Sequence, residues 1–73
     1  MTAVMVWVMA TQGRDLRIER AIADISVKRL GEQMGLSRQA LWALERRAEV
    51  SEERAAQYRR ALRDIIETSE RVA

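Results

Sequence analysis

The sequence predicts an all-α fold, a small bundle of about four helices in a single domain that spans residues 1–73. The chain has only 73 residues, and its composition is 48% hydrophobic and 33% charged, with both signs interspersed. That balance is typical of a folded, helix-rich domain rather than a disordered tail. Apolar residues also recur at helical spacing in several segments, most of which begin at a serine. A domain this short buries only about 60% of the surface that its unfolded chain exposes, so we also expect a second subunit.

Composition excludes several classes of function. The chain contains no cysteine and no histidine, which excludes disulfide bonds, zinc sites of the usual ligands, and thiol or imidazole catalysis. We expect no catalytic residue, no metal site, no cofactor and no small-molecule ligand. The 13 basic residues exceed the 11 acidic ones by a formal charge of +2, which favours a polyanionic partner only weakly.

The first twelve residues contain the one segment with strand-like alternation. Its valines alternate with methionine and tryptophan, a period of two that predicts a β-strand: Val4, Met5, Val6, Trp7, Val8 and Met9. A lone strand leaves its backbone groups unsatisfied, so we expect residues 1–12 to pair with the same strand of a second subunit. A short buried helical turn or a disordered end is the alternative, and the internal methionines leave a later translation start open.

The apolar run in this segment, from Ala3 to Ala10, is far shorter than the ~20 residues of a transmembrane helix. No basic residue precedes it, as one would in a secretory signal. We therefore expect no membrane segment and a location in the bacterial cytoplasm or nucleoid.

Serines mark the expected starts of three helices. Each follows an aliphatic residue and lies four positions before a small or aliphatic one, as an N-cap within a hydrophobic staple does: Ile25-Ser26 with Leu30, Leu36-Ser37 with Leu41, and Val50-Ser51 with Ala55. These starts predict helices over residues 27–34, 38–48 and 52–71. Upstream, one more set recurs at the spacing of a helical face and predicts a helix over roughly residues 15–24: Ile18, Ala21, Ile22 and Ile25.

The last helix carries an apolar stripe with a period near 3.5 residues: Ala55, Tyr58, Leu62, Ile65 and Val72. Two segments are therefore candidates for the dimer interface. They are the N-terminal run, through Val4, Val6, Trp7 and Val8, and this stripe, through Tyr58, Leu62 and Ile65. We expect the N-terminal run to matter more, because a single domain of four helices already needs Leu62 and Ile65 for its own core.

Residues 27–47 together have the pattern of a helix-turn-helix motif. Gly35 supplies the positive φ that a tight turn between two helices needs, and the small Gly31 lets the second helix approach the first. Leu41 and Leu44 then direct one side of the second helix inward.

The stretch LGEQMGLSRQALWALERR, residues 30–47, resembles the Cro/C1-type (XRE-like) helix-turn-helix regulators of phages, plasmids and bacterial chromosomes. With the flanking helices, the resemblance covers roughly residues 15–66. It implies a small DNA-binding domain from a phage, plasmid or other mobile element, whose second motif helix lies in the major groove. The chain departs from the family at Gly31, where alanine is commoner, in its single long helix after the motif, and in its apolar N-terminus.

Charge is concentrated in the motif. Residues 1–26 carry no net charge, residues 27–47 carry +3, and residues 48–73 carry −1. Such a concentration of positive charge is expected of a segment that meets DNA phosphates.

At roughly 100° per residue, the second motif helix divides into two sides. One side gathers Ala40, Leu41, Leu44 and Ala48; the other carries the residues that we expect to face DNA, which are Arg38, Gln39, Trp42, Ala43 and Arg46. The resemblance implies that Ser37, Arg38 and Gln39 are the first base readers, and arginine matches guanine as glutamine matches adenine. Phosphate contact or solvent exposure is the alternative for Arg38 and Gln39. Trp42 is expected to contact the groove or backbone rather than the core. Lys28 and Arg47 are better placed for phosphates, with solvated surface charge as the alternative.

We therefore expect a regulator that binds specific sequences of double-stranded DNA, as a homodimeric repressor acting on an inverted-repeat operator. The alternative is a protein-interaction module, such as an antitoxin or adaptor, that uses the helix-turn-helix as a scaffold and holds its partner through the last helix and the apolar N-terminus. An enzyme is not expected, because no nucleophile has a base beside it.

Overall fold

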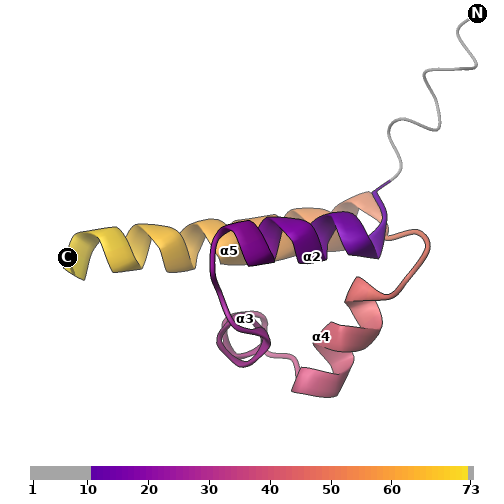
Figure 1. Ribbon diagram of the computed structural model, residues 1–73, viewed down its shortest axis with the longest axis horizontal. Coiled ribbons are helices and arrows are strands. Elements are labelled where there is room, and N and C mark those ends of the chain that lie inside the picture. The colour runs from indigo at the N-terminus through magenta and orange to yellow at the C-terminus, as the bar shows by residue number, and fades with distance from the viewer. Residues whose placement is uncertain (1–10, 73) are drawn as a thin grey trace, which may run out of the picture.

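The computed structural model describes residues 11–72, and within that range the chain forms four helices (Figure 1). They are α2 (Gly13–Ile22), α3 (Val27–Met34), α4 (Arg38–Glu45) and α5 (Glu52–Val72). The prediction of a small all-α bundle is confirmed. The predicted N-terminal strand, with Val4, Val6, Trp7 and Val8, lies outside the described residues. None of the helices in this range is long and apolar enough to cross a membrane.

The helices α2 and α5 run side by side in the same direction, and α3 and α4 pack beneath them (Figure 1). A single antiparallel bridge ties the entrances of α2 and α5, because the Val50 N–H donates to the Thr11 carbonyl at 2.8 Å. Figure 1 shows α3 end on while α4 lies across the view, so the two motif helices cross at a steep angle. The predicted arrangement of two short helices joined by a tight turn is therefore present.

All three predicted serine caps form. The hydroxyl oxygens of Ser26, Ser37 and Ser51 each accept a hydrogen bond from the backbone N–H three residues ahead, at 3.0, 3.1 and 3.1 Å. Each bond satisfies a first-turn donor that has no partner within the helix. The starts of α3, α4 and α5 are thus set by local chemistry.

The ends of α2 and α3 share one hydrogen-bond pattern, in which two backbone N–H groups turn back onto the last helical carbonyls. After α3, Gly35 adopts a φ of 72° and its neighbour Leu36 donates to the Gly31 carbonyl at 2.8 Å. After α2, Asp24 takes the same left-handed role with a φ of 59°, so this helix ends at Ile22, before the predicted residue 24. Both ends are Schellman motifs, which reverse the chain within a few residues.

The core joins side chains from all four described helices. Its fully buried members are Leu16, Leu30, Leu41 and Tyr58. The interpretation of Tyr58, Leu62 and Ile65 as a dimer interface is wrong, because these side chains are only 0%, 6% and 4% exposed within one chain. They pack inside the bundle and leave no surface for a second subunit.

The apolar stripe that predicts α2 is not the buried face of that helix. Ile18 is 48% exposed and Ile22 is 81% exposed, whereas Leu16 is fully buried. Arg20, half-buried, lies on the Leu16 side and makes polar contacts with α4. A buried polar contact therefore fixes the orientation of α2, and the isoleucines remain on the surface.

Gly31 packs against the turn that joins the two motif helices, and a Cβ atom there would lie 2.7 Å from the Leu36 carbonyl oxygen. We expect Gly31→Asn to lower the free energy of unfolding by about 1–3 kcal/mol, because a backbone atom must move to admit the side chain. Gly35→Asn is the matched control, since nothing lies within 4 Å of its Cβ and asparagine tolerates a positive φ. Urea denaturation measures both, and equal losses would contradict the assigned role of Gly31.

Candidate nucleic-acid interface

The helix α4 is anchored along one side and open along the other. Leu41, Leu44 and Glu45 are buried, at 0%, 6% and 4% exposure. The side predicted to meet DNA is exposed throughout: Arg38, Gln39, Trp42, Ala43 and Arg46. Trp42 is 47% exposed and does not belong to the core. Ala40 and Ala48, which were expected on the inner side, are exposed because α4 ends at Glu45 and only its leucine edge meets the bundle.

The remaining predicted contacts lie at the edges of this surface. Ser37 is exposed, and its hydroxyl oxygen caps α4, which leaves the hydroxyl proton free to donate. Arg47 follows the C-terminal end of α4, and its carbonyl accepts from the Gly13 N–H at 2.9 Å. Lys28 is exposed in the first turn of α3. The structure therefore places every predicted DNA-contacting side chain on the surface of the motif.

The positive charge of this surface is not neutralised within the described part of the chain. Ion pairs there involve only two basic residues, Arg20 with Glu45 and Arg59 with Glu19. The basic residues of the motif form no such pair: Lys28, Arg29, Arg38, Arg46 and Arg47. Exposed cations without an internal partner are available to an external polyanion.

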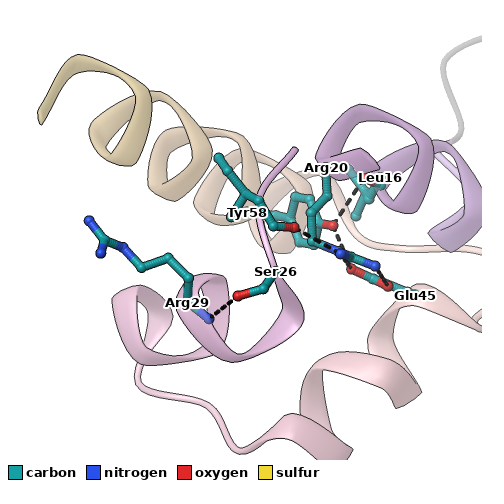
Figure 2. A network of polar contacts seen from close by, with 7 residues as sticks. Leu16, Arg20, Ser26, Arg29, Glu45 and Tyr58 are labelled. Atoms are coloured by element: carbon teal, nitrogen blue, oxygen red, sulfur yellow. Dashed lines mark hydrogen bonds and ion pairs between the residues drawn. The ribbon is translucent and has the colours of Figure 1, made fainter. Parts of the chain in front are cut away.

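A buried polar network holds α4 against α2 and α5 (Figure 2). The Arg20 guanidinium donates to both carboxylate oxygens of Glu45, at 2.8 and 3.2 Å, and to the Ile25 carbonyl at 2.9 Å. The Tyr58 hydroxyl lies 2.6 Å from a Glu45 oxygen and 3.0 Å from the Leu16 carbonyl. The one hydroxyl proton favours the charged carboxylate, because charge-assisted bonds are shorter and stronger.

Charge and burial in this network shift two pKa values. A hydrogen bond from Arg20 to Glu45 raises the pKa of the arginine, so its charge is held firmly. Burial, followed by the hydrogen bond to the Glu45 carboxylate, raises the pKa of Tyr58 well above its ordinary value. A tyrosinate at this site would be poorly solvated and would lie beside the Glu45 carboxylate.

Sequence reasoning did not identify Glu45 as a structural residue. One signal was present, because Glu45 lies one helical turn after Leu41 and so on the edge of the buried side. Its partners could not be found in this way, since Arg20 and Tyr58 lie 25 and 13 residues away in the chain.

No model of a known protein family, no curated protein and no solved structure matches the chain. The function is therefore argued from the site itself. Its elements are a basic helical surface, a tight turn between two short helices, and a buried network that holds α4 against α2 and α5.

The Tyr58 hydroxyl makes stability sensitive to alkali. Its pKa is raised by folding, so its contribution is complete below the ordinary tyrosine value of about 10 and is lost as pH rises beyond it. We expect the urea midpoint of the wild type to fall above about pH 10. Tyr58→Phe should remove the part of this alkaline loss that tyrosine ionisation causes. It should also lower the free energy of unfolding by about 1–3 kcal/mol at neutral pH, because a buried carboxylate loses a donor.

Tyrosinate absorbance checks the same point directly, since Tyr58 is the only tyrosine of the chain. Ionisation should coincide with loss of helical circular dichroism. A tyrosine that ionises near its ordinary pKa in the folded chain would contradict the network.

Proposed function

We propose that the protein binds specific sequences of double-stranded DNA as a transcriptional regulator, acting as a homodimeric repressor on an inverted-repeat operator in the bacterial cytoplasm or nucleoid. The observation that carries this proposal is the exposed side of α4, where cationic and amide side chains stand on a helix whose other side is locked in the core. The major groove of B-DNA, about 12 Å wide, admits one α-helix. A polyanion explains why such a surface keeps its cations free of internal ion pairs.

The proposed readout follows from position along α4. Arg38 and Gln39 occupy the first turn, where the helix would enter the groove. An arginine fork matches the two acceptors of guanine, and the glutamine amide matches the acceptor and donor of adenine. Lys28, Arg46 and Arg47 lie further out and would neutralise phosphates, which adds affinity but little discrimination.

The network around Glu45 supports this assignment because it prepares α4 before DNA arrives. Contacts from α2 and α5 fix the helix from behind. A reader held by a rigid element loses less conformational entropy on binding than one on a loop. Arg38 and Gln39 would thus meet base edges from a helix whose orientation is already fixed before DNA binds.

The rival proposal, a protein-interaction module, is favoured by one observation: two isoleucines of α2, Ile18 and Ile22, are exposed. Exposed aliphatic side chains at one helical face suit a protein contact. The two functions differ in salt dependence, since binding to random duplex DNA that weakens with added salt is required only by the first.

We expect Arg38→Ala and Gln39→Ala to relax specificity at one or two operator positions, by about 1–3 kcal/mol for each base contact. Lys28→Ala should instead weaken binding to every duplex alike, because a phosphate contact carries no sequence information. Selection of binding sites from random duplexes, followed by anisotropy titrations, measures both effects. Equal losses on selected and random DNA for all three variants would contradict the assignment of readers, and a wild type without salt-dependent DNA binding would contradict the function.

We also expect the full chain to be a dimer without DNA, because so short a bundle gains from further apolar burial. Sedimentation at micromolar concentration gives the mass. Removal of residues 1–10 should abolish the dimer, whereas Ile22→Glu, which places a charge on an already exposed site, should leave it intact. A monomeric wild type would contradict the prediction, and a dimer broken only by Ile22→Glu would move the interface to α2.

A further inference from the structure

A hollow on the surface borders the C-terminal half of α4, away from the first-turn residues predicted to read bases. Its walls come from two helices, α2 and α4, and it is lined by Arg17, Arg20, Trp42, Glu45 and Arg46. Three arginines and one glutamate give the lining a net charge of +2. Arg17 lies in α2, outside the helix-turn-helix, so the motif pattern does not identify it as a DNA contact.

The charges of this hollow have unequal roles. Arg20 is 15% exposed at its side chain and is bound to Glu45 through two hydrogen bonds, so these two residues form a neutral floor. Arg17 and Arg46 are exposed, and neither forms an ion pair within the described residues. Two guanidinium groups without an ion pair in the described structure therefore line the same hollow as the exposed indole of Trp42.

The hollow lies where the wall of a groove would be. Arg46 follows Arg38 by eight residues, which is about 12 Å along a helix at ~1.5 Å per residue. The major groove is about 8.5 Å deep, so a helix that enters it N-terminus first, with Arg38 at the base edges, brings Arg46 to the level of the sugar-phosphate backbone. Arg17 lines the same hollow from α2.

We propose that Arg17 and Arg46 together bind one backbone phosphate at the edge of the major groove, with the adjoining deoxyribose packed on the Trp42 indole. This inference rests on the proposed DNA-binding function and extends the interface beyond the helix-turn-helix to α2. Guanidinium groups suit the ligand, because their planar forks match phosphate oxygens. The Arg20–Glu45 pair serves as a positioning element that holds α2 and α4 at the spacing this site needs.

The test compares Arg17→Ala with Arg63→Ala in titrations of a selected operator and a random duplex over a series of salt concentrations. Arg63 is the matched control, an exposed arginine on a helix, in a hollow lined by no residue of α4. Arg17→Ala should weaken binding to both duplexes by roughly three- to tenfold and lower the salt slope by about 0.9, the value for one phosphate contact. Arg63→Ala should change neither.

The double variant Arg17→Ala/Arg46→Ala shows whether the phosphate is shared. If the phosphate needs both arginines, the salt slope of the double variant should fall by about 0.9 in total rather than twice that value, because Arg17→Ala alone already releases the phosphate. Arg17→Lys should recover most of the slope but not all of the affinity, since lysine keeps the charge without the fork.

Two outcomes would overturn the inference. One is an Arg17→Ala variant that behaves like Arg63→Ala while Lys28→Ala still weakens binding, which would leave the proposed DNA function standing without this site. The other is an additive double variant, which would separate the two arginines onto different phosphates. Circular dichroism and urea midpoints equal to the wild type show that Arg17→Ala is folded, as expected of an exposed side chain.

Discussion

The Glu45 carboxylate is the point at which α2, α4 and α5 are joined by polar contacts. It is 4% exposed, so its negative charge is stable only because Arg20 and Tyr58 supply donors at 2.8 and 2.6 Å. A buried ion pair adds little net stability compared with a well-packed apolar contact, but it tolerates very few geometries. Its value here is that it fixes how three helices are oriented in a thin core.

That constraint explains the unexpected orientation of α2. A purely apolar bundle would turn Ile18 and Ile22 inward, because two of the three large aliphatic side chains of this helix lie on that face. The structure turns Leu16 and Arg20 inward instead, so that the guanidinium reaches Glu45 and the Ile25 carbonyl. The same rotation brings Arg17 beside Trp42 and Arg46. One polar network thus shapes both the exposed apolar face of α2 and the hollow beside α4.

The two sides of α4 have different roles. The inner side carries Leu41, Leu44 and Glu45, which bind the helix to the bundle. The outer side carries basic and amide groups with no internal partner in the described structure, and its orientation follows from the inner contacts. A surface of this kind is preorganised, because binding need not order the helix that presents it.

Local signals in the sequence specified where three of the four described helices begin and where α3 ends. Ser26, Ser37 and Ser51 cap helices through bonds that reach only three residues ahead, and Gly35 ends α3 through its own φ. The sides of α4 were also predictable at Leu41, Leu44, Trp42 and Arg46, because helical periodicity alone assigns them. These features depend on atoms close together in the chain, so local chemistry specifies them.

Contacts between distant segments settled three further points: which face of α2 is buried, where Glu45 finds its partners, and whether Tyr58, Leu62 and Ile65 are free for another subunit. Tyr58 meets Leu16 across 42 residues, and Arg20 meets Glu45 across 25. Periodicity identifies an apolar stripe but not the element that covers it. It also assigns every arginine to the surface, because it carries no information about a buried partner such as Glu45. Those outcomes depend on contacts between distant segments, whose free energies decide between orientations that the local sequence allows equally.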